Sequence, residues 1–155
     1  MPIKSVVVNA SPIICLSKAG LIDLLPKLFY SIIIPREVVA EVGIITGFPE
    51  GFSHDAGPTP IIPDSVSAWD LGKGESAVIT WCLSDKSRWA ILDDREACRC
   101  ADTLGCYHTG TIGILLLAKK AEIVTSVTPF IHKLSNSGLW MSERFINEII
   151  RSCGE

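Results

Sequence analysis

The feature that most constrains the fold is a series of short apolar segments that alternate with helical segments. These segments lie at 5–8, 32–34, 89–92 and 106–108. Strands that face solvent on one side alternate apolar and polar residues, whereas strands buried on both faces are apolar throughout. Such strands alternating with helices are typical of a parallel sheet covered by helical layers. The sequence therefore predicts an α/β domain with a parallel sheet.

Helix signals fill the intervals between these strands. Ser11 followed by Pro12 is a helix-start signal, because Ser11 can cap the helix and Pro12 suits its first turn. We expect this helix to run to about Lys18, with Gly20 as its stop. Apolar spacing and end signals predict further helices at 21–29, 36–42, 75–83, 95–104, 112–121, 129–135 and 143–152.

The segment 43–63 differs from the rest because glycine and proline recur along it. This composition predicts a loop, and a loop of this length is often functional. Within it, Ile61 and Ile62 are candidates for a third strand at the edge of the sheet. Too little chain lies on either side to build two cores, so we expect residues 1–155 to form a single domain.

Composition excludes several classes of protein. Hydrophobic residues make up 48% of the chain and charged residues 20%, which excludes a disordered protein. The formal net charge of −3 excludes a module that binds nucleic acid by charge alone. No apolar run approaches the ~20 residues of a membrane span. Residues 1–4 lack a signal-peptide layout, so the expectation is a cytoplasmic protein.

The six cysteines form no Cys-x-x-Cys pair. We expect them to be small apolar residues of the core in a reducing cytosol. A redox or metal-binding role is the alternative, and a redox protein would need an exposed thiol with a low pKa.

Acidic and amide side chains follow the strand ends. Asn9 follows the strand at 5–8, and Asp93 and Asp94 follow the strand at 89–92. Glu41 lies in the helix after 32–34, and Glu75 opens the helix after a glycine-rich turn. The carboxyl ends of parallel strands share one sheet edge, where ligands bind. Clustered carboxylates repel one another unless a cation is present, and oxygen ligands suit Mg²⁺ or Mn²⁺. Such ions activate water and hold a phosphate during hydrolysis.

Each of these residues also has a simpler explanation. Asn9 could cap the following helix, and the Asp93–Asp94 pair could cap the helix at 95. Glu41 could be a solvated helix residue, and Glu75 could favour a helix first turn through the helix dipole. Their joint placement favours a metal site, because the simpler explanations would otherwise have to coincide at one edge.

The motifs around these residues resemble those of PIN-domain nucleases. The resemblance is to a PIN-like branch that has Glu in the third acidic motif, where VapC-type toxins have Asp. It implies a three-layer α/β/α fold with a parallel sheet ordered 3-2-1-4-5. It also implies an Mg²⁺- or Mn²⁺-dependent endoribonuclease, often the toxin of a toxin–antitoxin pair. The similar segments are Val8–Ile14, Ile34–Val42, Leu71–Glu75, Leu92–Ala97, Thr109–Leu115 and Gly154–Glu155.

The resemblance also implies site roles. Metal would be held by Glu41, Glu75 and Asp94, with Asn9 standing where the family usually has Asp. The resemblance also implies that Ser11 supports the site by hydrogen bonding. Asp93 or Glu96 would supply an extra ligand or orient water. An amide oxygen ligates Mg²⁺ without charge, so we expect weaker binding. The alternative function is a catalytically weak or inactive PIN-like module that binds RNA or a protein.

Basic and aromatic residues indicate partners. Lys73 and Arg95 are the candidates for RNA binding, because Lys and Arg commonly contact phosphates. The acidic balance means that RNA binding must depend on local patches and bound cations. An antitoxin protein could cover the acidic edge.

Four tryptophans in so apolar a chain predict a subunit interface, and hence a homodimer. They are Trp69, Trp81, Trp89 and Trp140.

Overall fold

The computed structural model describes residues 5–43, 52–53 and 57–155. Within these ranges five strands form one sheet, in which every pairing is parallel and the order is β3-β2-β1-β4-β5. This confirms the expected architecture and strand order. The strands are β1 (Ser5–Val8), β2 (Ser31–Ile33), β3 (Phe52–Ser53), β4 (Trp89–Ile91) and β5 (His108–Thr109).

The central strand β1 explains why the sheet is parallel and buried. Val6, Val7 and Val8 are completely buried, and β-branched side chains of this kind fit a pleated strand covered on both faces. Val6 pairs with Ile32 on one side and with Trp89 on the other. Helical layers must therefore cover both faces of the sheet.

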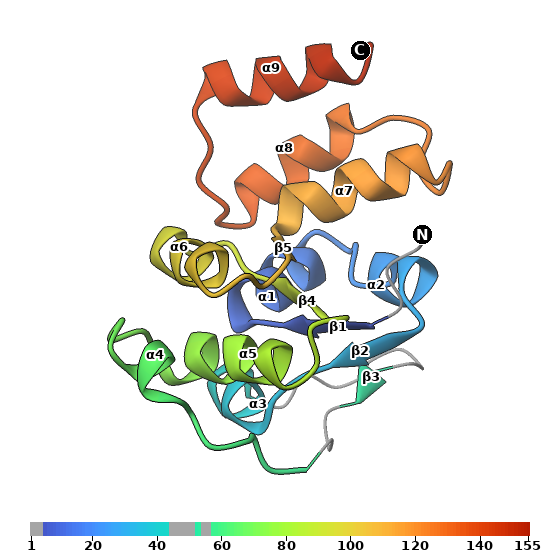
Figure 1. Ribbon diagram of the computed structural model, residues 1–155. Coiled ribbons are helices and arrows are strands. Elements are labelled where there is room, and N and C mark those ends of the chain that lie inside the picture. The colour runs from blue at the N-terminus through green and yellow to red at the C-terminus, as the bar shows by residue number, and fades with distance from the viewer. Residues whose placement is uncertain (1–4, 44–51, 54–56) are drawn as a thin grey trace.

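Helices cover both faces of the sheet and give three layers (Figure 1). Figure 1 shows α1, α2 and α7 on one side of the sheet and α3, α4 and α5 on the other, while α8 and α9 lie beyond α7. The helices are α1 (Ala10–Lys18), α2 (Leu24–Leu28), α3 (Arg36–Val42), α4 (Asp64–Ser67), α5 (Lys73–Ser84), α6 (Arg95–Thr103), α7 (Thr111–Lys120), α8 (Thr128–Asn136) and α9 (Glu143–Ser152). None of those helices is long and apolar enough to cross a membrane.

A hydrophobic cluster runs from β1 to α9. It contains fully buried side chains from both helical layers, such as Ile13 of α1 and Ile79 of α5. The last helix contributes Ile146 and Ile149. The outer helices α8 and α9 therefore share the apolar core of the sheet.

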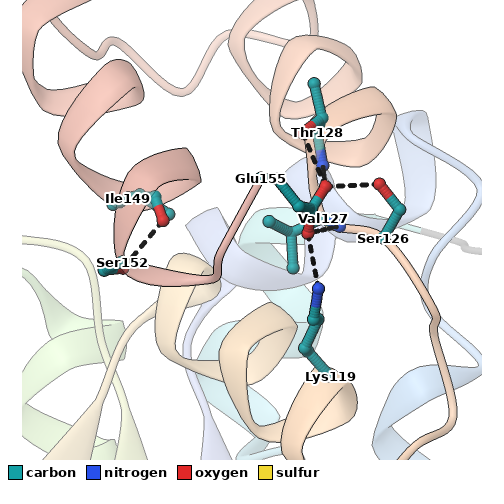
Figure 2. Close-up of polar contacts among 7 residues, drawn as sticks. All are labelled: Lys119, Ser126, Val127, Thr128, Ile149, Ser152 and Glu155. Atoms are coloured by element: carbon teal, nitrogen blue, oxygen red, sulfur yellow. Dashed lines mark hydrogen bonds and ion pairs between the residues drawn. The ribbon is translucent and has the colours of Figure 1, made fainter.

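A polar cluster fastens the chain beyond α9 (Figure 2). The Glu155 carboxylate accepts hydrogen bonds from Lys119 Nζ at 2.7 Å, from Val127 N at 2.9 Å and from Thr128 Oγ1 at 2.7 Å. The Thr128 amide and the Ser126 hydroxyl donate to the same carboxylate. Together, the ammonium group and these hydrogen bonds hold the pKa of Glu155 well below its usual range. We call this set of contacts the Glu155 clamp, and it joins the end of the α9 segment to α7 and to the start of α8.

The prediction of a third strand at Ile61 and Ile62 was wrong. The edge strand is Phe52–Ser53, and the backbone of Ile34 also donates to Ser53 O at 2.9 Å. Ile61 and Ile62 lie outside any strand, and the Ile61 side chain is 95% exposed. The short helix α4 follows them and was not predicted. Residues 44–51 and 54–56 of the expected loop lie outside the described residues.

Two further expectations change in detail. Ser11 does not cap α1, because the helix begins at Ala10 and Asn9 occupies the capping position. Three tryptophans are accounted for within the fold, since Trp81 is buried and Trp69 and Trp89 pack against the core. Trp140 is 85% exposed, so among the tryptophans the expected interface rests on Trp140.

Candidate active site at the carboxyl edge of the sheet

Asn9 lies at the carboxyl end of the central strand, where β1 passes into α1. Its backbone N–H donates to Ile91 O of the neighbouring strand at 3.1 Å. The residue is only 2% exposed, and its side chain does not cap α1. Asn9 Oδ1 is buried and finds no hydrogen-bond partner among the residues that the structure describes. An unsatisfied buried acceptor costs ~1–3 kcal/mol, so this oxygen indicates a place for a ligand.

Glu41 reaches the same place from the last turns of α3. Its Oε1 accepts a hydrogen bond at 3.1 Å from the backbone N–H of Gly74, in the first turn of α5. A Cβ atom at position 74 would lie 2.6 Å from Glu41 Oε1 and 3.0 Å from Asn9 Oδ1. The two oxygens therefore lie against the backbone of residue 74, a close approach that needs glycine at this position. The sequence indicated a turn at this glycine but not its contact with either oxygen.

Glu75 lies in the first turn of α5, as expected, but its carboxylate folds back over the helix start. A Cβ atom at Gly72 would lie 2.5 Å from Glu75 Oε2. A carboxylate in this position is stabilised by the partial positive charge of the helix N-terminus. The contacts of Glu75 therefore agree with the simpler explanation.

Asp93 and Asp94 hold the starts of two different helices. Asp94 Oδ2 accepts from Ala97 N at 2.9 Å and caps α6. Asp93 accepts from Thr111 N at 2.8 Å and from Thr111 Oγ1 at 2.5 Å, at the start of α7. A Cβ atom at Gly110 would lie 2.7 Å from Asp93 Oδ1, so this close approach also needs glycine. Both oxygens of Asp93 are occupied, whereas Asp94 Oδ1 stays free of hydrogen bonds to the described chain.

The structure does not assemble the full set of ligands that the resemblance implies. In the described ranges no three or more His, Cys, Asp or Glu side chains are grouped so that they could hold a metal ion. The fold brings Asn9 and Glu41 together at Gly74. Glu75 and Asp94 instead lie at helix starts, where Glu75 is stabilised electrostatically and Asp94 accepts a hydrogen bond.

The residues expected to support the site lie around this edge with other contacts. The Ser11 hydroxyl lies beside the Cys15 thiol, and Glu96 forms an exposed ion pair with Arg99 at 3.0 Å. Lys73 lines a pocket of about 520 Å³ beside Glu41. Arg36 lines the same pocket, and sequence reasoning did not single it out.

The thiols do not support the redox alternative. Burial raises the pKa of the Cys15 thiol, the Asp93 carboxylate raises it further, and hydrogen bonding to Ser11 lowers it. Burial likewise raises the pKa of Cys82, Cys100 and Cys106. Burial, followed by the nearby Asp93, Asp102 and Asp94, raises the pKa of Cys98 to about 11. Each of these five thiols is therefore a weaker nucleophile than a free cysteine near neutral pH.

A parallel sheet ordered β3-β2-β1-β4-β5 between helical layers, with acidic side chains at its carboxyl edge, defines a three-layer α/β/α fold. The chain belongs to the PIN-domain family, since the family model DUF3368, whose description is "PIN domain", matches residues 5–155. PIN domains generally depend on divalent metal ions. No curated protein and no solved structure matches the sequence.

Proposed function

We propose that the protein is an Mg²⁺- or Mn²⁺-dependent endoribonuclease that hydrolyses RNA phosphodiesters. The observation that carries this proposal is the buried, unpartnered Asn9 Oδ1, which lies together with Glu41 Oε1 against the backbone of Gly74. Two hard oxygen donors brought together in this way suit a small divalent cation. The convergence of these donors follows from the contacts of this chain and does not depend on the family resemblance.

Asn9 and Glu41 would hold the ion, while Glu75 and the free Oδ1 of Asp94 lie at the same edge of the sheet outside this pair. When bound, the ion would supply water activation and charge stabilisation at the phosphate. Gly74 N–H orients the Glu41 carboxylate by its hydrogen bond. Lys73 and Arg36, which line the pocket beside Glu41, would bind phosphates of the RNA chain.

The proposal is tested by calorimetric titration of Mn²⁺ into the metal-stripped protein. We expect binding by the wild type and loss of binding in Glu41→Gln, which keeps the side-chain shape but removes the charge. Glu148→Gln is the matched control, because Glu148 lies on α9 and pairs with the exposed Arg144. A single-stranded RNA should be cut in Mn²⁺ by the wild type and by Glu148→Gln only. A wild-type protein that binds no Mn²⁺ and cuts no RNA would contradict the proposal.

The second candidate is a PIN-like module that binds RNA or a protein without cutting. The amide at position 9 favours this candidate, because the side chain of Asn9 carries an N–H donor as well as an oxygen and either can face Glu41. Rotated by half a turn, the amide would present its N–H groups, in place of Oδ1, at the position that it shares with Glu41 Oε1 beside Gly74, so that no cation is needed there. This candidate predicts RNA or protein binding that is insensitive to Mn²⁺ and is not followed by cleavage.

We further propose that the protein acts in the cytoplasm as a homodimer, and that an antitoxin-type protein covers the acidic edge. Sedimentation of the purified protein tests the dimer, and monomer alone at micromolar concentration would count against it. The reading frame next to its gene tests the toxin–antitoxin arrangement, because such pairs are encoded side by side. A binding protein encoded there should suppress any cleavage by the purified protein.

A further inference from the structure

A second pocket, of about 740 Å³, lies beside the acidic edge. One wall comes from α6, β5 and the start of α7, and the other comes from residues 139–142 and Phe145. Figure 1 shows the connection between α8 and α9 passing near α6, in agreement with the two walls of the pocket. We call it the α6–α9 pocket. Its volume is in the range of sites that bind small organic ligands.

Two aromatic rings of the α6–α9 pocket are open to solvent. Trp140 is 85% exposed and Phe145 is 43% exposed, although both line the pocket. Trp140 makes no hydrogen bond and no ring contact with the described chain. Leu139 and Met141, on either side of it, instead pack against the core. Its two anchored neighbours therefore fix the backbone at Trp140 and present an unpartnered ring to a ligand.

The charged groups of the pocket connect it with the candidate active site. Asp93 lines the pocket and adjoins Asp94, which carries the free carboxylate oxygen at the acidic edge. Arg95 lines the pocket next to these residues and forms no ion pair with any described residue. His108, also in the wall, is held by Asp102 at 2.7 Å. A flat ring, a free guanidinium and the acidic edge thus follow one another along a single surface.

We propose that the α6–α9 pocket receives one unstacked nucleobase of single-stranded RNA, with the base on Trp140 and an adjacent phosphate on Arg95. The proposal rests on the proposed function, because it names the substrate class of that site. Bases stack on exposed aromatic side chains, and a guanidinium binds phosphate. A paired base has no free face, so the pocket selects unpaired strands. A bound peptide segment is the competing occupant, and the abasic and duplex ligands described below distinguish it from a base.

The experiment measures binding of a labelled single-stranded RNA oligonucleotide by fluorescence anisotropy in EDTA, where no metal-dependent cleavage occurs. The same oligonucleotide with one abasic position, and its duplex, are the comparison ligands. The variant is Trp140→Ala. The matched control is Tyr30→Ala. Tyr30 is 90% exposed, but it lies at the amino end of β2, away from the carboxyl edge of the sheet.

We expect Trp140→Ala to weaken single-strand binding about fivefold or more, as loss of one stacked base does. In the wild type, one abasic position should weaken binding and the duplex should bind more weakly than the single strand. Both differences should vanish in Trp140→Ala and persist in Tyr30→Ala. Quenching of tryptophan fluorescence by the oligonucleotide should also be lost only in Trp140→Ala. Equal melting temperatures of the variants would exclude misfolding as the cause.

Several outcomes would overturn the proposal. They are absence of single-strand binding by the wild type, equal binding by Trp140→Ala, or an abasic effect that survives in Trp140→Ala. If Trp140→Ala instead dissociates a dimer and leaves RNA binding unchanged, then Trp140 belongs to a subunit interface. Cleavage in Mn²⁺ is scored separately. Cleavage without a Trp140 effect overturns only the base pocket, and a Trp140 effect on binding without cleavage overturns only the nuclease.

Discussion

Gly74 has no side chain, and this allows the oxygens of Glu41 and Asn9 to approach its backbone closely. We predict that Gly74→Ala keeps the fold but abolishes Mn²⁺ binding. The residue lies in helix α5, and alanine favours a helix over glycine by ~1 kcal/mol, which offsets the cost of moving the flexible Glu41 carboxylate. Thermal melting and Mn²⁺ calorimetry on the same sample check both parts. Normal Mn²⁺ affinity in Gly74→Ala would show that the ion does not bind at this glycine.

Asn9 decides how much charge the candidate site holds. We predict that Asn9→Asp lowers stability in EDTA, because a second carboxylate is then buried beside Glu41. In millimolar Mn²⁺ the order should reverse, since the added charge strengthens cation binding and the bound ion stabilises the folded state. Melting temperatures with and without Mn²⁺ measure the effect. The same Mn²⁺-induced shift in both proteins would contradict this role for residue 9.

The sequence predicted which residues lie at the carboxyl edge and offered the helix-start roles of Glu75 and Asp94, but it did not predict the contacts of Glu41 and Asp93. Asn9, Asp93 and Asp94 follow strand ends, and strand direction alone places such residues on one edge. Hydrogen bonds to distant backbone determine the rest. Thr111 is 18 residues from Asp93, and Gly74 is 33 residues from Glu41, so no local pattern in the sequence contains either contact.

The stability of helix α6 depends on the Asp94 carboxylate, which caps its first turn. We predict that Asp94→Ala costs about 1 kcal/mol of unfolding free energy because the hydrogen bond to Ala97 N is lost. Asp94→Asn should keep most of this stability, since an amide oxygen still accepts the bond. Urea denaturation of the two variants compares them directly. Equal losses would show that the charge of Asp94, rather than its capping bond, stabilises α6.

The Glu155 clamp makes the attachment of α9 sensitive to pH. The folded-state pKa of this carboxyl lies below its ordinary value of 4.5, first because of Lys119 and then because of Ser126, Thr128 and Val127. Its contribution to stability is therefore present above the ordinary value and is lost as the pH falls towards the lowered pKa. We predict that Glu155→Gln melts at a lower temperature at pH 7, and that this difference shrinks at acidic pH. Glu148→Gln, in α9, should show no such pH-dependent difference.

Elements with strong local signals were predicted well, and the edge of the sheet was not. The expected bounds 36–42 and 143–152 agree with α3 and α9, where apolar periodicity and first-turn signals coincide. The strand β3 has two residues and is defined by its pairing with Ile32 and Ile33, which the sequence of a glycine- and proline-rich segment does not reveal. Ile61 and Ile62 are apolar enough for a strand, but the Ile61 side chain faces solvent.

At the scale of the whole molecule, the hydrophobic cluster links β1 to α9. We predict that the protein unfolds in one cooperative transition, as expected for a single domain. Far-ultraviolet circular dichroism follows the helices, and tryptophan fluorescence follows Trp81 within the core. The two denaturation curves should coincide. Separate midpoints would show that the α8–α9 layer unfolds independently of the sheet.

The alternation of strands and helices predicted the fold class of the whole molecule, but it did not predict the strand order. The order 3-2-1-4-5 came from the resemblance of the motifs to a family, and the pairings of the sheet confirm it. Periodicity cannot supply such an order, because each of these apolar strands would be buried equally well at several positions in a covered parallel sheet.

The adjacent carboxylates Asp93 and Asp94 have a practical consequence for spectroscopy. They place two backbone amide protons, those of Thr111 and Ala97, in direct contact with the acidic edge. The chemical shift of each amide proton responds to the strength of the hydrogen bond that it donates to the carboxylate. In an isotope-labelled sample, a diamagnetic cation such as Mg²⁺ that reached Asp94 would shift the Ala97 resonance more than that of Thr111. The protein thus contains two built-in indicators, on neighbouring residues, of which carboxylate an ion occupies.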